Sequence, residues 1–99
     1  MKYKTVIGIV VLTPERHIHI ITRHPIMEFY IKHIGEVLSR PEKVRFSNYT
    51  DNILLFYRYF ANIENGKYIV VVVNKSEHSV KTTYLSDRVK GGRIYEQES

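Results

Sequence analysis

The chain has 99 residues, with 15 Lys and Arg against 10 Asp and Glu, and we expect residues 1–99 to form a single domain with one modest core. Cysteine is absent, which excludes disulfides, thiolate metal sites and cysteine nucleophiles and agrees with a reducing cytoplasm. The formal net charge of +5 favours an acidic partner such as nucleic acid, an anionic lipid or an acidic protein.

The first predicted element is a strand over residues 6–12, a β-branched apolar run bounded by turn residues. This run is far shorter than the roughly 20 apolar residues that cross a bilayer. No small-residue cleavage site of a signal peptide follows it. We therefore expect a cytoplasmic protein that does not act at a membrane.

A helix is predicted next, because Thr13, Pro14 and Glu15 have the order of an N-cap, a first helical residue and a first-turn acid. Residues 17–20 also alternate like a strand after a proline turn, and this is the competing interpretation. The capping pattern favours the helix. Pro25 should end it, because the residue before a proline is driven away from helical angles.

A second helix is predicted between Pro25 and Pro41. Six apolar residues recur there at helical spacing and define one apolar face: Met27, Tyr30, Ile31, Ile34, Val37 and Leu38. Four strands should follow, at residues 43–47, 53–60, 68–75 and 79–85. Their short connections favour antiparallel pairing of neighbours. The sequence thus predicts an α+β domain: an N-terminal strand, two helices and a four-stranded antiparallel meander, with the helices packed on one face.

Three side chains suited to phosphate chemistry lie at the end of the first predicted helix: His19, Arg23 and His24. His19 and Arg23 are four residues apart and so share one helical flank. Histidine changes charge near neutral pH and suits acid or base catalysis, whereas the guanidinium matches phosphate oxygens. The structural alternative is a solvated flank whose basic end complements the helix dipole. For the three residues together we favour function.

Arg58 interrupts a long aromatic strand, on the face that alternation gives to Leu54, Phe56 and Phe60. An unpaired buried charge is costly, so this arginine needs a partner or an opening to solvent. It either extends past the aromatic rings at the sheet edge or enters a cleft to bind phosphate. The sequence leaves both interpretations open.

The last predicted strand carries hydroxyl groups. Alternation assigns one side to Val80, Thr82, Tyr84 and Ser86, and the other to Lys81, Thr83 and Leu85. Thr82 and Tyr84 could hydrogen-bond a phosphate, although both residue types are also common in ordinary strands. The candidate RNA-binding residues are Arg23, Lys81, Ser86, Arg88 and Lys90.

Tyrosines on the predicted strands could stack unpaired bases if their rings face solvent: Tyr57, Tyr59, Tyr68 and Tyr84. Most strand tyrosines only pack, so this indication is weak. The remaining histidines, His17, His33 and His78, are expected to be structural or simply exposed. No carboxylate or cysteine accompanies them at ligand spacing, so no metal site and no cofactor is expected.

Several separated segments form a pattern that resembles one known family. They are residues 12–16 (Leu-Thr-Pro-Glu-Arg) with His19 and residues 23–25 (Arg-His-Pro), residues 38–42 (Leu-Ser-Arg-Pro-Glu), residues 56–58 (Phe-Tyr-Arg) with residues 66–68 and 70–73, and residues 82–88 (Thr-Thr-Tyr-Leu-Ser-Asp-Arg) with Lys90. Together they resemble phage-barnase-EndoU-colicin-RelE-like (PBECR) nuclease domains. The chain departs from that pattern at Ile26, where an acidic residue commonly follows the proline, and mildly at Thr83 and Ser86.

The resemblance implies a BECR-type fold, with two helices followed by a four-stranded antiparallel sheet. It also implies a metal-independent ribonuclease that often serves as a toxin or a host-directed effector. A toxic nuclease needs an inhibitor, so an acidic antitoxin or immunity protein is an expected partner beside RNA.

The leading hypothesis is an endoribonuclease in which a 2′-hydroxyl attacks the adjacent phosphate and leaves a cyclic phosphate and a 5′-hydroxyl end. His19 would act as general base or acid, with His24 as its counterpart. The residues that would hold and position the phosphate are Arg23, Arg58, Thr82 and Tyr84. The alternative is a non-catalytic module that binds RNA or a protein through the same cleft. A structural protein with incidental histidines is a third interpretation.

Overall fold

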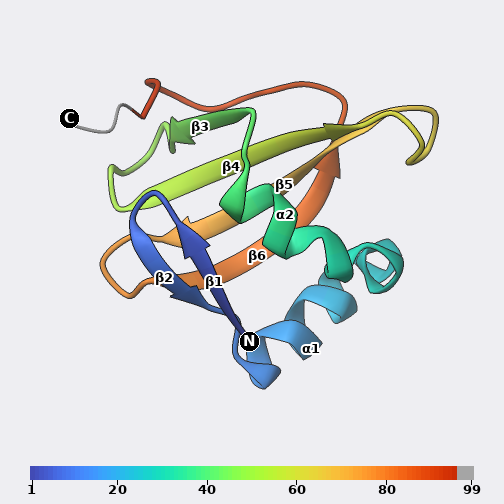
Figure 1. Ribbon diagram of the computed structural model, residues 1–99, viewed down its shortest axis with the longest axis horizontal. Coiled ribbons are helices and arrows are strands. Elements are labelled where there is room, and N and C mark those ends of the chain that lie inside the picture. The colour runs from blue at the N-terminus through green and yellow to red at the C-terminus, as the bar shows by residue number, and fades with distance from the viewer. Residues whose placement is uncertain (96–99) are drawn as a thin grey trace.

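The structure, a computed structural model, describes residues 1–95, so residues 96–99 of the predicted domain lie outside the described part. Its main feature is one curled sheet of six strands in the order β1-β2-β6-β5-β4-β3 (Figure 1). The strands are β1 (Lys2–Thr5), β2 (Gly8–Val11), β3 (Lys43–Phe46), β4 (Ile53–Phe60), β5 (Lys67–Asn74) and β6 (Ser79–Ser86). Neighbours pair antiparallel except β2 and β6, which are parallel. The predicted α+β class and the four-stranded meander are confirmed.

The N-terminal region forms a hairpin, so the strand predicted over residues 6–12 is confirmed only over residues 8–11, as β2, and β1 was not predicted. Val6 and Ile7 form the turn between β1 and β2. The Thr5 hydroxyl accepts a hydrogen bond from the Ile7 amide at 3.0 Å and donates one to the Gly8 carbonyl at 2.9 Å. Gly8 has a φ of 103°, which glycine adopts without a Cβ clash. These local hydrogen bonds make a turn of the first two residues of the apolar run, so its strand begins at Gly8.

The first helix, α1 (Pro14–Arg23), begins and ends where the capping signals predict. The Thr13 hydroxyl accepts a hydrogen bond from the Arg16 amide at 3.2 Å, and Pro14 occupies the first turn. The competing interpretation, a strand at residues 17–20, is therefore wrong. Only Ile20 of this helix is fully buried, which leaves the rest of α1 available at the surface.

The second helical region has the predicted apolar face but is divided into three parts. They are the 3₁₀ segments η1 (Pro25–Phe29) and η2 (Ile31–His33) and the helix α2 (Ile34–Ser39). Tyr30 interrupts the helical backbone, with φ −120° and ψ 1°. The buried residues still recur along one side: Met27, Ile34, Val37 and Leu38. Packing against the core therefore determines which side of this region is buried, although the backbone between the two prolines is not one regular helix.

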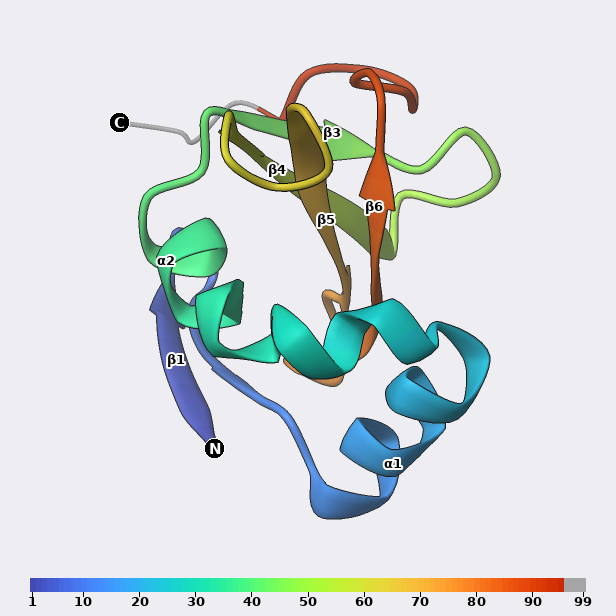
Figure 2. The same ribbon diagram turned by 90° about the vertical axis from the view of Figure 1, so that its right-hand side faces the viewer.

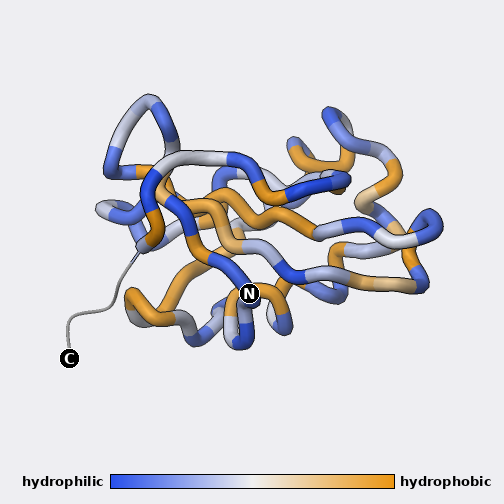
Figure 3. Tube along the Cα trace, turned by 90° about the horizontal axis from the view of Figure 1, so that it is seen from above, coloured by the Kyte–Doolittle hydropathy of each residue, from blue (hydrophilic) through white to orange (hydrophobic). Residues whose placement is uncertain are grey.

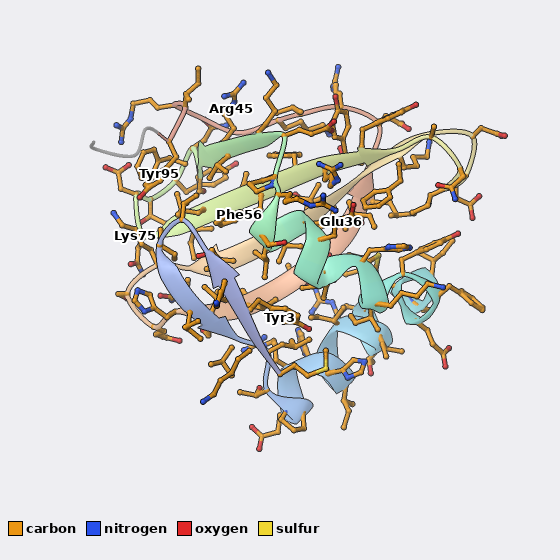
Figure 4. The ribbon with its side chains drawn as sticks, in the orientation of Figure 1. Tyr3, Glu36, Arg45, Phe56, Lys75 and Tyr95 are labelled. Carbon is orange, nitrogen blue, oxygen red and sulfur yellow. The ribbon has the colours of Figure 1, made fainter. Side chains whose placement is uncertain are left out.

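The core lies between α2 and one face of the meander, which we call the helix face (Figure 2). It is formed there by Leu54, Phe56, Ile69, Val71, Val73 and Val80. Figure 4 shows Phe56 at the centre of this layer, beside α2. The apolar strand segments, orange in Figure 3, run through the middle of the molecule, and polar turns lie at its ends.

The sheet face away from α2, which we call the open face, carries a second set of side chains. Its members from β4, β5 and β6 are Leu55, Tyr57, Tyr59, Tyr68, Val70, Val72, Thr82, Tyr84 and Ser86. Val80 does not belong to this set, so the predicted sharing of one side by Val80 and Thr82 is wrong. Val73 pairs with Val80 and Val72 with Thr82, so Lys81 is an extra bulged residue. The bulge reverses the alternation at that point.

Thr83 lies on the helix face and is fully buried, and its hydroxyl donates to the Val70 carbonyl at 2.7 Å. We expect Thr83→Val to lower the free energy of unfolding by about 1 kcal/mol, because a buried hydrogen bond is lost. Urea denaturation measures this. Thr22→Val removes a similar hydroxyl from the exposed side of α1 and should change stability by less than about 0.5 kcal/mol. Equal effects of the two substitutions would contradict the assignment.

After β6 the chain crosses back to β3, an arrangement that the sequence did not predict. The Tyr57 hydroxyl hydrogen-bonds the Lys90 carbonyl and accepts from the Lys90 amide. The Phe46 amide donates to the Arg93 carbonyl at 2.8 Å, and Arg45 forms a β-bridge with Ile94. Within residues 1–95, no helix is both long and apolar enough to cross a membrane.

Candidate functional site

A cavity of about 410 Å³ lies between α1 and the open face of the sheet. It is lined by Arg16, His19, Arg23, His24, Ile53, Val72, Lys81 and Thr82. The α1 residues reach it because Arg16, His19 and Arg23 lie one helical turn apart along a single flank. Pro25 ends α1, and this leaves His24 as its C-cap at the mouth of the same cavity. The predicted His19–Arg23 flank therefore faces Thr82.

The cavity is electropositive. Arg16, Arg23 and Lys81 contribute three cations, and no carboxylate lines its wall. In the part of the chain that the structure describes, none of the three forms an ion pair within 4.0 Å. Lys81 reaches the cavity because it is the bulged residue of β6. Unpaired cations around a concave surface favour an anionic ligand.

Tyr84 lies at the boundary between this cavity and a second one. Its ring centroid is 5.9 Å from that of His24, and its side chain also lines the second cavity, of about 440 Å³. That cavity is further lined by Leu85, Ser86, Asp87, Arg88 and Lys90. We call the two cavities together the basic groove. The two cavities meet where His24 of the first contacts Tyr84 of the second, and their lining residues on this side extend from Lys81 to Lys90.

Burial raises the pKa of the Tyr84 phenol above 10.0. The phenol therefore stays protonated at neutral pH and acts as a hydrogen-bond donor to an anion. Because the folded-state pKa is raised, Tyr84 contributes stability below about pH 10 that is lost as the pH rises through the folded-state value. We expect a ¹³C-tyrosine NMR titration, assigned with Tyr84→Phe, to place its midpoint above 10.0. A midpoint at or below that value would contradict the burial.

Two polar side chains of the second cavity, Ser86 and Asp87, are already engaged by neighbouring residues. The Ser86 hydroxyl donates to the Arg88 carbonyl at 2.7 Å, so the turn already uses its proton. Asp87 pairs with Lys67, and this hydrogen bond lowers the pKa of the Asp87 carboxyl. Arg88 and Lys90 make no ion pair among residues 1–95. The cations of this cavity, rather than Ser86, therefore remain available for phosphate contacts.

Arg58 lies on the helix face and does not join the basic groove. Its Nε is 3.3 Å from Oε1 of Glu36, and its Nη1 donates to the Arg40 carbonyl at 2.8 Å. The Arg40 guanidinium contacts the same Glu36 oxygen at 3.2 Å. Figure 4 shows Glu36 on α2, which covers the helix face. Neither interpretation left open for Arg58 describes its position, because β4 is not an edge strand and Arg58 lines neither cavity of the groove. It is a paired arginine that holds the end of α2.

Arg58→Met should therefore lower stability. We expect the free energy of unfolding to fall by about 1 kcal/mol, because a helix-end hydrogen bond and a partly exposed ion pair are lost. The matched variant Arg23→Met removes a cation that makes no ion pair among residues 1–95 and should preserve stability. Urea denaturation measures both variants. An equal effect of the two substitutions would contradict the assigned role of Arg58.

The other histidines lie outside the groove. His33 is half-buried, with its ring centroid 4.8 Å from that of Phe60, and His78 occupies a turn with a φ of 51°. His17 belongs to α1 but does not line either cavity of the groove. Across residues 1–95, no group of three or more His, Cys, Asp or Glu side chains gathers at metal-binding distance.

The structure adds residues that the sequence did not indicate as site residues. Arg16 lines the cavity three positions before His19, and helical spacing could have identified it. Ile53 and Val72 form the apolar floor, and only the sheet register brings them beneath α1. The chain matches no family model, curated protein or solved structure in the three comparisons that were made.

Proposed function

We propose that the chain is an endoribonuclease that needs no metal ion and whose active site is the basic groove. One observation carries this proposal: His19, His24, Arg23, Lys81 and Thr82 line one cavity although they come from two distant parts of the sequence. Two imidazoles beside unpaired cations can supply both proton transfers and charge stabilisation for phosphodiester cleavage.

In the proposed reaction, His19 accepts the proton of a ribose 2′-hydroxyl as its oxygen attacks the adjacent phosphorus. His24 donates a proton to the departing 5′-oxygen, so a 2′,3′-cyclic phosphate and a 5′-hydroxyl end are formed. Arg23 and Lys81 stabilise the charge that develops on the phosphoryl oxygens. Thr82 and the neutral Tyr84 phenol position those oxygens by hydrogen bonds.

The order of elements supports a BECR-like fold, because two helical regions precede a four-stranded antiparallel meander. On the basis of the resemblance to PBECR domains, we further propose that the chain is a toxin-like or phage-related effector that acts in the cytoplasm. An acidic antitoxin or immunity protein would bind the basic groove. Its carboxylates would pair with the cations that otherwise hold RNA.

A non-catalytic module that binds RNA or an acidic protein is the second candidate. His19 is exposed, and neither imidazole is hydrogen-bonded to another described side chain that would orient it. Catalytic histidines are commonly held by such a partner. Catalytic hydrogen bonds can nevertheless form only when substrate binds. We rank this candidate second because binding alone does not require two imidazoles in one cavity.

The test is RNA incubated with purified protein in the presence of EDTA, with the ends of the products identified chemically. We expect cleavage that resists EDTA and yields 2′,3′-cyclic phosphate and 5′-hydroxyl ends. His78→Asn is the control and should cleave like the wild-type protein, because this histidine lines neither cavity of the groove and asparagine suits the positive φ at that position. RNA binding without cleavage would support the second candidate, and cleavage lost in EDTA would contradict a metal-independent mechanism.

A further inference from the structure

Three tyrosines form an edge-to-face cluster on the open face, beside the basic groove. Tyr59 of β4 pairs directly with Tyr68 of β5, and their ring centroids are 5.2 Å apart at 67°. The Tyr57 and Tyr68 rings are 6.2 Å apart at 86°. Edge-to-face contacts of this kind stabilise aromatic pairs and fix their orientation.

Exposure increases along this cluster. Tyr57 is 1% exposed and is bound to the backbone of Lys90, whereas Tyr68 is half-buried. Tyr59 is 44% exposed and is the cluster's outermost ring. The buried Tyr57 and the half-buried Tyr68 therefore support Tyr59, which presents aromatic surface to solvent.

Gly66 helps to hold Tyr59 in place. A Cβ at position 66 would lie only 2.0 Å from the Tyr59 hydroxyl oxygen, so the phenol crosses directly over this glycine. Gly66 also has a φ of 103° in the turn between β4 and β5. The Tyr59 ring is thus packed against the turn on one side and against Tyr68 on another.

The cluster is continuous with the basic groove through the sheet register. Tyr68 pairs with Ser86, which lines the groove, and Lys67 joins Asp87 across the same pair of strands. Along β6 the distance from Thr82 to Ser86 is about 14 Å, at about 3.4 Å per residue. The tyrosines therefore lie at the end of the groove remote from His19, beyond the reach of one nucleotide bound at the histidines.

We propose that Tyr59 and Tyr68 form a stacking subsite for an unpaired base of an RNA strand whose phosphates follow the basic groove. The inference rests on the proposed function and narrows its substrate to single-stranded RNA several nucleotides long. Stacking on an aromatic ring suits any base, because every base has a π-face. In an RNA duplex the bases are stacked on each other, so this surface could not reach them. Arg88 and Lys90 line the second cavity of the groove together with Ser86, which is paired with Tyr68, and would supply phosphate contacts there.

The test uses a fully 2′-O-methylated single-stranded oligonucleotide, which cannot be cleaved by 2′-hydroxyl attack, with 2-aminopurine as a reporter base. We expect binding to the wild-type protein to quench the reporter. Tyr59→Ala should weaken binding about tenfold, within the range measured for one stacked base, and relieve the quenching. Tyr59→Phe should retain both, because it keeps the ring. Tyr49→Ala removes a tyrosine that is 97% exposed at another loop and is the matched control.

Cleavage of a dinucleotide and of a longer RNA separates this inference from the proposed function. We expect Tyr59→Ala to raise KM for the longer RNA and to leave dinucleotide cleavage unchanged. Unchanged oligonucleotide affinity and quenching in Tyr59→Ala would overturn the stacking subsite while leaving the nuclease proposal standing. Equal affinity of the wild-type protein for duplex and single-stranded RNA would also overturn it. A wild-type protein that binds no oligonucleotide would overturn both.

Discussion

His19→Ala is expected to reduce RNA cleavage by at least about 100-fold, because general acid–base catalysis by one side chain contributes roughly 10²–10⁴. The imidazole of His19 lines the cavity that also holds His24, Arg23 and Thr82. Among residues 1–95, only His19 and His24 line this cavity with an imidazole. No third histidine is therefore placed to take over the role of either one. The measurement is single-turnover cleavage of a labelled RNA in EDTA, with protein in excess.

Three controls distinguish catalysis from folding or binding. His19 is exposed, so His19→Ala should change the free energy of unfolding by less than about 0.5 kcal/mol. Binding of the 2′-O-methylated oligonucleotide should be retained, because Arg23 and Lys81 remain. His24→Ala should also lower the cleavage rate without loss of stability or binding, because it removes the side chain proposed to donate the second proton. A His19→Ala protein that cleaves like wild type would refute the mechanism.

The elements with strong local signals could be predicted from the sequence. Thr13 and Pro14 have side chains that fix a helix start by themselves, and Pro25 fixes its end. The long strands β4 and β5 are rich in β-branched and aromatic residues and are bounded by turns, so their limits were predicted to within a residue. The His19–Arg23 flank follows directly from the helix, because helical spacing alone puts the two side chains together.

The features that could not be predicted from the sequence depend on contacts between segments that are distant along the chain. The bulge at Lys81 exists only relative to β5, and no residue type in β6 marks it. Arg58 finds Glu36 and the end of α2 across the core, a partner that strand alternation does not reveal. The return of residues 92–95 to β3 is likewise fixed by backbone pairing with Phe46 and Val44. Arg58, which was predicted to be a catalytic residue, lies outside the basic groove because it makes this contact.

The bulge makes a prediction about deletions in the sheet that has a large expected effect. Removing Lys81 brings Val80 and Thr82 into regular pairing with Val73 and Val72, so every other side chain keeps its face. Removing Val71 from β5 instead shifts one end of that strand by a residue against β4, because β5 has no extra residue to lose. Half of β5 then turns its side chains to the opposite faces, so an apolar residue leaves the core and a polar one enters it. We expect this second deletion to cost at least about 3 kcal/mol, from lost apolar burial and an unsatisfied polar group in the core.

Urea denaturation of the two deletion variants decides the matter, because they have the same length. The Val71 deletion should be unfolded or strongly destabilised, whereas the Lys81 deletion should remain folded and cost less than half as much. Lys81→Ala keeps the bulge and isolates the loss of the cation, so it should weaken RNA binding without a large change in stability. Equal destabilisation by the two deletions would show that Lys81 is not the extra residue of β6. The faces assigned to Thr82 and Tyr84, and with them the second wall of the basic groove, would then be incorrect.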